Sequence, residues 1–179
     1  MRVISGALGG RRLASPPGGT RPTSDRVREA LFSTLGPVEG MRVLDLFAGS
    51  GALAIEALSR GASQAVLVEK DRRTARVAGE NIETLGLDDR ATLVVGRAEA
   101  ELARLARDGE QFGLVFADPP YRQGLETLRG LSAGLSRVVA PGGRIVVESH
   151  RRDPAALDLP MVHERQYGDT AIRIHAAPQ

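Results

Sequence analysis

The strongest restriction on the fold of this chain is a regular alternation, from Met41 onwards, between short apolar runs and amphipathic segments. The apolar runs are continuous, as expected of strands in a parallel sheet that helices cover on both faces. The predicted strands are 43–47, 65–68, 92–95, 114–117 and 145–148, and the predicted helices are 52–59, 71–85, 99–107 and 125–139. This order is typical of a doubly wound α/β fold of the Rossmann-like class.

The C-terminal end of the chain departs from this alternation. The apolar runs 161–166 and 171–174 are separated only by Tyr167-Gly168-Asp169-Thr170. Two strands joined by a short glycine-containing turn predict a hairpin. We therefore expect a mostly parallel, seven-stranded sheet that ends in an antiparallel hairpin.

The N-terminal end is also distinct. Residues 3–4 and 12–13 flank a glycine-rich stretch and predict a small hairpin, and Thr23-Ser24-Asp25 supplies capping residues for a helix that Gly36 ends. A chain of 179 residues fits one domain. We expect a single domain, 1–179, in which a hairpin-plus-helix extension, 1–35, precedes a core, 36–179.

Composition argues against several kinds of site. The chain has no cysteine, and its three histidines, His150, His163 and His175, lie far apart in the sequence. We therefore expect neither a disulfide nor a metal site. The N-terminus has no long apolar stretch, so we expect no signal peptide, no membrane span and a cytoplasmic location. We also expect a monomer.

The positive charge of the chain is concentrated at its N-terminus. Residues 1–30 carry six arginines and two carboxylates, a net charge of +4, whereas the remainder carries −2 because the whole chain is +2. A basic segment on a nearly neutral body is expected of nucleic-acid-binding proteins, although proteins that bind no nucleic acid also have it. We expect Arg11, Arg12 and Arg21 to contact phosphates; the alternative is a solvated basic loop.

A candidate cofactor site follows the first predicted strand of the core. Gly49-Ser50-Gly51 allows a tight turn and close approach of a ligand where a helix begins. Glu69, 20 residues after Gly49, ends the next strand, at the spacing of a carboxylate that accepts hydrogen bonds from a ribose. Asp45 would repel phosphates but favours an ammonium and a sulfonium group, which S-adenosylmethionine carries. The alternatives are a turn-capping Asp45 and a solvated Glu69.

A candidate catalytic site is Asp118-Pro119-Pro120-Tyr121, at the end of the strand 114–117. Two prolines end a strand abruptly, because neither has an N–H group for the sheet. A carboxylate and a backbone carbonyl can accept hydrogen bonds from the exocyclic amine of a base, and an aromatic ring can stack on the base. The alternative is a proline-terminated strand with an incidental tyrosine.

These motifs resemble those of class I methyltransferases that act on exocyclic amines. The segments Arg21-Pro22-Thr23-Ser24-Asp25-Arg26-Val27-Arg28-Glu29-Ala30-Leu31-Phe32, 44–53 and Glu56-Ala57-Leu58-Ser59-Arg60-Gly61 closely resemble the bacterial ribosomal RNA small subunit methyltransferase D family. The resemblance extends from Ile4 to the turn at 167–170. It implies methylation of N2 of a guanine in 16S rRNA with S-adenosylmethionine, on naked rRNA or on a small ribosomal subunit assembly intermediate.

The resemblance also implies roles for individual residues. Asp118, the Pro119 carbonyl and Tyr121 are the expected catalytic groups, and Tyr121 also contacts the substrate RNA together with the three arginines. The expected cofactor-binding residues are Asp45, Phe47, Ala48, Gly49, Ser50, Gly51, Glu69, Lys70, Arg97, Ala98 and Asp118.

One segment departs from the family pattern. Related enzymes usually have an acidic residue after the glycine of the third strand, placed to bind the adenine amine, whereas this chain has Gly96-Arg97-Ala98-Glu99. Adenine recognition then passes to the Ala98 backbone or to Glu99. Two other functions remain open at this point: a DNA adenine-N6 methyltransferase, and a non-catalytic RNA-binding assembly factor.

Overall fold

The computed structural model describes residues 1–16, 24–119, 124–151, 157 and 159–177, without the side chains of 124–126 and 150. Its elements, in chain order, are α1 (Asp25–Leu35), β1 (Arg42–Asp45), α2 (Ala52–Ser59), β2 (Gln64–Glu69), α3 (Arg72–Thr84), β3 (Ala91–Val95), α4 (Ala98–Arg107), β4 (Phe112–Ala117), α5 (Gly124–Val138), β5 (Val139–His150), β6 (Met161–Tyr167) and β7 (Thr170–Ala176).

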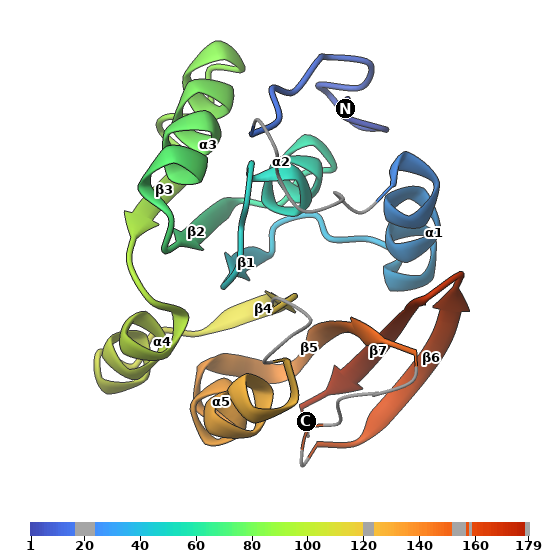
Figure 1. The fold of residues 1–179 in the computed structure, drawn as a ribbon, viewed down its shortest axis with the longest axis vertical. Coiled ribbons are helices and arrows are strands. Elements are labelled where there is room, and N and C mark those ends of the chain that lie inside the picture. The colour runs from blue at the N-terminus through green and yellow to red at the C-terminus, as the bar shows by residue number, and fades with distance from the viewer. Residues whose placement is uncertain (17–23, 120–123, 152–156, 158, 178–179) are drawn as a thin grey trace.

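The strands form one seven-stranded sheet in the order β3-β2-β1-β4-β5-β7-β6. The five strands β1 to β5 pair in parallel, and β7 pairs antiparallel with both β5 and β6. Helices α1, α2 and α3 lie on one side of the sheet and α4 and α5 on the other (Figure 1). The predicted fold class, including the C-terminal hairpin, is confirmed.

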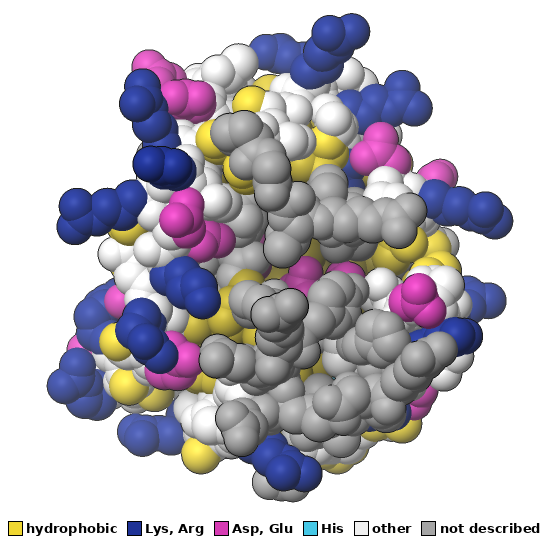
Figure 2. Space-filling model, in the orientation of Figure 1, with side chains coloured by type: hydrophobic (Ala, Val, Ile, Leu, Met, Phe, Trp, Pro, Cys, Tyr) yellow, Lys and Arg dark blue, Asp and Glu magenta, His cyan; other side chains and the backbone are white. Residues whose placement is uncertain are grey.

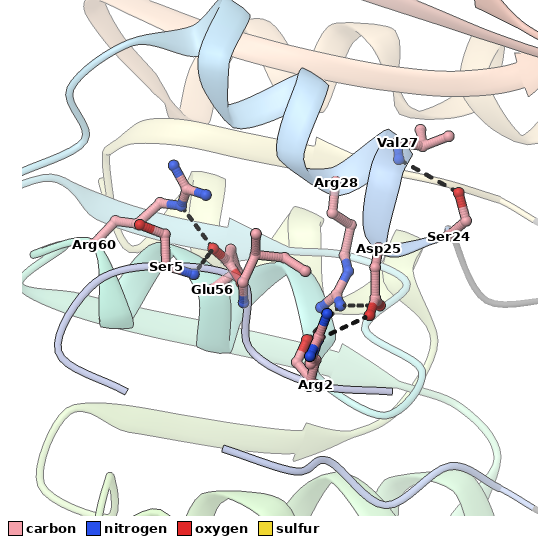
Figure 3. Close-up of polar contacts among 9 residues, drawn as sticks. Arg2, Ser5, Ser24, Asp25, Val27, Arg28, Glu56 and Arg60 are labelled. Atoms are coloured by element: carbon pink, nitrogen blue, oxygen red, sulfur yellow. Dashed lines mark hydrogen bonds and ion pairs between the residues drawn. The ribbon is translucent and has the colours of Figure 1, made fainter. Parts of the chain in front are cut away.

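The helix boundaries follow from local sequence. Asp71 accepts a hydrogen bond from the Thr74 N–H at 2.8 Å and so caps the start of α3. Gly86, with φ +64°, ends that helix in the left-handed conformation expected from sequence. Ser24 caps α1 in the same way through the N–H of Val27 (Figure 3).

Each face of the sheet buries its own core. Phe116, Val146 and Leu67 face α1, α2 and α3 in one apolar cluster, whereas Val115 and Val147 face α4 and α5 in the other. Burial of these continuous runs removes apolar surface from water on both faces of the central strands. The alternation of faces along β4 and β5 also fixes where their C-terminal side chains point.

The N-terminal hairpin consists of one antiparallel bridge, between Arg2 and Arg12, and packs on the C-terminal half of α2. Glu56, fully buried in α2, accepts hydrogen bonds from the backbone N–H groups of Ile4 at 2.7 Å and Ser5 at 3.1 Å, and pairs with Arg60 at 2.7 Å (Figure 3). These bonds satisfy a carboxylate that could not otherwise be buried. The hairpin is therefore attached by polar contacts as well as by apolar packing.

Gly6 sets how closely the hairpin approaches α2. Its φ is +82°, and a Cβ at this position would lie 1.9 Å from the backbone oxygen of Ser59. The Ser59 hydroxyl accepts a hydrogen bond from the N–H of Leu8 at 2.9 Å and donates to the Ser5 carbonyl at 2.5 Å. Only glycine fits this contact.

The structure differs from the sequence-based expectation in β5. The segment Pro141-Gly142-Gly143, which reads as a turn before a strand at 145–148, lies within a longer strand that starts at Val139. Val139 pairs with Phe112, and the register then shifts so that Arg144 pairs with Leu114. The two glycines form an irregularity in the strand instead of separating two elements.

Candidate active site

Four carboxylates lie where parallel strands end at one edge of the sheet. Asp45 ends β1, Glu69 ends β2, Asp118 follows β4 directly, and Glu148 lies near the end of β5. Because Asp45 pairs with both Leu67 and Phe116, and side chains alternate along a strand, Asp45, Glu69 and Asp118 extend from the same face. In open α/β sheets, ligands bind at this edge.

The glycine turn between β1 and α2 provides a backbone surface at this edge. Gly49 and Gly51 have φ of +56° and +84°, which explains why both are glycine. A Cβ at Gly51 would lie 3.0 Å from the Leu67 side chain, whereas one at Gly49 would meet no atom of the described residues within 4 Å. Gly51 is thus confined by packing, and Gly49 faces open space.

Glu69 is held against this turn. One carboxylate oxygen accepts a hydrogen bond from the Gly49 N–H at 3.0 Å, and the other accepts one from the Asp71 N–H at 2.8 Å. Each carboxylate oxygen can accept a further hydrogen bond. Glu69 is therefore oriented by the protein backbone and still able to bind a ligand hydroxyl.

Asp45 is almost completely buried, with 1% of its surface exposed. Burial raises its pKa to about 7, and the negative charge of Glu69 adds to this effect, whereas the backbone N–H groups of Phe47 and Ala54 oppose it. Its Oδ2 atom has no hydrogen-bond partner among the described residues. A buried carboxylate oxygen without a partner fits a cationic ligand.

Asp118 is the second carboxylate with a strongly perturbed acidity. Burial raises its pKa well above the usual range, and the negative charges of Glu148 and Asp45 raise it further. Pro119, which follows it, is buried. Perturbed carboxylates at a strand edge are typical of functional sites. Tyr121, the other residue predicted for this corner, lies outside the described residues.

Several of the other predicted cofactor residues surround this edge. The Ala48 N–H donates to the Val68 carbonyl at 3.0 Å, which ties the turn to β2. Lys70 is exposed beyond Glu69. Arg97 precedes α4 with its side chain 77% exposed and 3.5 Å from Glu99, and Ala98 is buried at the first position of that helix. Their roles toward a ligand stay predictions.

The predicted RNA-contacting arginines lie on the N-terminal hairpin. Arg11 and Arg12 are both exposed, and Arg11 donates a weak hydrogen bond, at 3.4 Å, to the Thr84 carbonyl at the end of α3. They are not among the residues at the strand edge. Arg21 lies outside the described residues.

Asn81 of α3 connects the N-terminal segment to the glycine turn. No motif in the amino-acid sequence indicates this role. Its amide nitrogen donates to the carbonyls of Ser50 at 2.9 Å and Ala14 at 3.1 Å, and its oxygen accepts from the Ala14 N–H at 2.8 Å. With 4% of its surface exposed, this side chain holds both segments through one buried bond, to Ser50, and two partly buried bonds, to Ala14.

Glu148 was also absent from the sequence-based site. It follows the apolar run 145–147 as Asp45, Glu69 and Asp118 follow theirs, so the same signal was available.

Figure 2 shows acidic and hydrophobic side chains near the middle of this side of the molecule and basic side chains around its rim. Among the described residues, no group of three or more His, Cys, Asp or Glu side chains is arranged to hold a metal ion.

No helix in the described part of the chain is both long enough and apolar enough to cross a membrane.

Comparisons with known proteins agree with this geometry. A family described as "Conserved hypothetical protein 95" matches residues 1–176. The chain is 46% identical over 127 residues to ribosomal RNA small subunit methyltransferase D of Escherichia coli, across 70% of this chain and 62% of that protein. It is 33% identical over 179 residues to the protein of the same name from Haemophilus influenzae, across 98% of this chain and 93% of that one.

A solved structure of similar shape comes from Escherichia coli and is named "Putative methyltransferase yhhF". It superposes with a TM-score of 0.84 at 38% sequence identity, across all of this chain and 99% of the other. The likeness therefore includes the N-terminal extension as well as the sheet.

Proposed function

Because this chain belongs to the ribosomal RNA small subunit methyltransferase D family, described as Conserved hypothetical protein 95, we propose that it methylates the exocyclic N2 amine of a guanine in 16S rRNA with S-adenosylmethionine. The observation that carries this proposal is that Asp45, Glu69 and Asp118 lie on the same face at one edge of the sheet, beside the glycine turn. A site for a cationic nucleoside thus adjoins a site for an amine.

The residues around the glycine turn fit the cofactor. The unpartnered Oδ2 of Asp45 would face its positive charge, Glu69 would accept hydrogen bonds from its ribose, and the open space at Gly49 would admit it to the backbone. The Ala98 backbone or Glu99, at the start of α4, is the candidate to bind its adenine, and Arg97 precedes them. When bound, S-adenosylmethionine supplies an electrophilic methyl group on its sulfonium.

Asp118 and Pro119 act on the amine of the base. The lone pair of guanine N2 is delocalised into the ring, so the amine is a poor nucleophile. Hydrogen bonds from its two N–H groups to the Asp118 carboxylate and the Pro119 carbonyl favour a tetrahedral nitrogen whose lone pair is free to react. The raised pKa of Asp118 also suits a group that accepts the proton released by the amine.

Positioning supplies most of the rate. Holding two reactants in line can lower a barrier by up to about 7–11 kcal/mol. Tyr121 is proposed to stack on the exposed base.

The N-terminal extension, 1–35, is proposed to bind the RNA, and the core, 36–179, to bind the cofactor. Arg11 and Arg12 are exposed on the hairpin, as phosphate contacts require. The bonds of Asn81 to Ala14 and Ser50 connect the two regions. The substrate is 16S rRNA or a small-subunit assembly intermediate, so the protein would act in the cytoplasm, and we propose that it acts as a monomer.

The test is methyl transfer from radiolabelled S-adenosylmethionine to three substrates in parallel: naked 16S rRNA, small ribosomal subunits and DNA. Label in N2-methylguanine of RNA is the expected result. Label in N6-methyladenine of DNA would instead identify a DNA methyltransferase. Binding of RNA without any transfer would indicate a non-catalytic assembly factor.

A further inference from the structure

Glu148 lies beside Asp118 on the neighbouring strand. Ala117 pairs with Val147 in the parallel register of β4 and β5, so the next residues along both strands are Asp118 and Glu148. Phe116 and Val146, two positions earlier, also pair and belong to the same apolar cluster. Because side chains alternate along strands, Asp118 and Glu148 extend from that same face.

The surroundings of this pair are acidic and largely enclosed. Glu148 is 9% exposed, and Asp45, at 1%, approaches Asp118 from the other neighbouring strand. The charges of Glu148 and Asp45 both raise the pKa of Asp118. Adjacent carboxylates in a partly buried site favour a ligand that brings several N–H donors. The unpartnered Oδ2 of Asp45 is an independent sign that the structure leaves acceptors here for a ligand.

We infer that Glu148 selects the target base by accepting a hydrogen bond from the ring N1–H of guanine, while Asp118 and the Pro119 carbonyl accept those of the N2 amine. This inference rests on the proposed function, and it adds a residue that determines specificity. Guanine carries adjacent donors, N1–H and the N2 amine. The two neighbouring carboxylates provide adjacent acceptors.

The same arrangement rejects other bases that carry an amine. Adenine and cytosine have a ring nitrogen with a lone pair next to the amine, and a carboxylate facing that lone pair repels it. Uracil has a ring N–H but no amine to methylate. A carboxylate that meets a lone pair where guanine presents an N–H donor discriminates strongly against the wrong base. The hydrogen bond from N1–H also draws electron density toward the reacting amine.

The base analogue 2-aminopurine tests this inference, because it keeps the amine at C2 but has a lone pair at N1. The substrates are two RNAs that carry guanine or 2-aminopurine at the position that the wild-type protein methylates. The measured quantity is the ratio of kcat/KM for guanine over 2-aminopurine. The variant is Glu148→Gln, whose amide can donate to the lone pair of 2-aminopurine. The control is Glu164→Gln, a carboxylate on β6 that pairs with Arg173 instead.

The wild type and the control should prefer guanine strongly. Glu148→Gln should lower that ratio by about 10- to 150-fold, the ratio that corresponds to one hydrogen bond to a charged group. Because 2-aminopurine also lacks the O6 atom, the change in the ratio, and not the ratio itself, reports on N1. Unchanged S-adenosylhomocysteine affinity and melting temperature would show that the variant keeps its fold.

An unchanged ratio in Glu148→Gln would overturn the inference and leave the proposed function intact. If the variant folds but methylates neither RNA, the two RNA dissociation constants are measured with S-adenosylhomocysteine bound. The preference for guanine in binding must then fall in the variant, as the preference in kcat/KM would. An unchanged binding preference also overturns the inference. Equal kcat/KM of the wild type for the two RNAs would overturn it without any variant. A wild type that methylates no rRNA would instead contradict the proposed function.

Discussion

Glu69 accepts a hydrogen bond from the backbone N–H of Gly49 at 3.0 Å, so the two residues that define the cofactor motif in the sequence contact each other directly. The same carboxylate accepts from the Asp71 N–H at the start of α3. Glu69 therefore orders the turn that it is also proposed to complete as a ribose site.

Replacing Glu69 should thus affect both binding and the fold. Glu69→Ala removes hydrogen bonds to a charged acceptor, so S-adenosylmethionine binding should weaken by about 1.5–3 kcal/mol. Thermal unfolding should also occur at a lower temperature, because the Gly49 N–H loses its partner. Glu69→Gln keeps an acceptor oxygen, so its cofactor affinity and melting temperature should lie between those of the wild type and those of Glu69→Ala. Calorimetry that gives the wild-type dissociation constant for Glu69→Ala would exclude a ribose contact.

The two glycines of the turn should respond differently to alanine. Gly51→Ala adds a Cβ 3.0 Å from the Leu67 side chain at a φ of +84°, so it should destabilise the fold by about 1–3 kcal/mol. Gly49→Ala, at a φ of +56°, meets nothing within 4 Å, and its main effect should be on ligand approach.

Denaturant melts and cofactor titrations of both variants measure this difference. Gly49→Ala should lose cofactor affinity by about 10-fold or more, out of proportion to its smaller loss of stability, because its methyl group occupies the space where the ligand meets the backbone. If both variants lost the same amount of stability and Gly49→Ala kept the wild-type cofactor affinity, the ligand would have to bind elsewhere.

Cofactor binding should depend on pH through Asp45, whose pKa is raised to about 7. The ionised carboxylate attracts a cation, so below pH 7 the protein must release this proton to bind. Affinity should then rise by up to about 10-fold per pH unit and level off above pH 7. Asp45→Asn should bind weakly at pH 8 and lose most of this dependence. Calorimetric titrations from pH 5.5 to 8.5 provide the comparison, and an unchanged slope in Asp45→Asn would assign the effect to another group.

The stability of the ligand-free protein should change with pH in the opposite direction. Folding raises the pKa of Asp45 above its unfolded value of 3.8, so the folded state holds this proton more tightly than the unfolded state. The contribution is complete below about pH 4 and is lost as the pH rises through 7. Asp45→Asn should remove this part of the decline in the free energy of unfolding with rising pH.

The basic extension should govern the salt dependence of RNA binding. Replacing Arg11, Arg12 and Arg21 with alanine should flatten the slope of log K against log salt concentration by about 2, because each phosphate contact releases counterions. Cofactor affinity should change little. A matched triple variant of Arg107, Arg129 and Arg137, exposed on α4 and α5, should keep the wild-type slope. The full slope in the first variant would exclude the extension as the RNA contact.

The sequence predicted the parts of this protein that depend on local pattern. The hydrophobic period and the segment lengths identified each strand and helix of the core, although β5 starts six residues earlier than expected. The 20-residue spacing of Gly49 and Glu69 identified two residues that are hydrogen-bonded to each other. The irregularity in β5 was not predictable, because Pro141-Gly142-Gly143 has the composition of a turn whether or not the flanking strand continues.

The contacts that the sequence did not predict join distant segments. Asn81 lies 67 residues from Ala14 and 31 from Ser50, and no local pattern links the three. Burial of Arg28 in α1 was also unexpected, because the apolar pattern of that helix did not include it. Arg28 donates to the Arg2 carbonyl at 2.6 Å and to Asp25 at 2.7 Å, a partner set supplied by the hairpin and the first turn of α1 (Figure 3).

The two roles proposed for Asp118 can be separated by its amide variant. Asp118→Asn keeps an oxygen that accepts one hydrogen bond but cannot accept a proton. Substantial residual activity would show that orientation of the amine accounts for most of the effect, whereas complete loss would point to charge or proton acceptance.

The most direct measurement is single-turnover methyl transfer to 16S rRNA by Asp118→Ala. The carboxylate acts on the amine in the transition state, so the rate should fall by about 100-fold or more, while the S-adenosylmethionine dissociation constant and the melting temperature stay close to those of the wild type. Methyl transfer to guanine at the wild-type rate by Asp118→Ala would contradict the proposed active site.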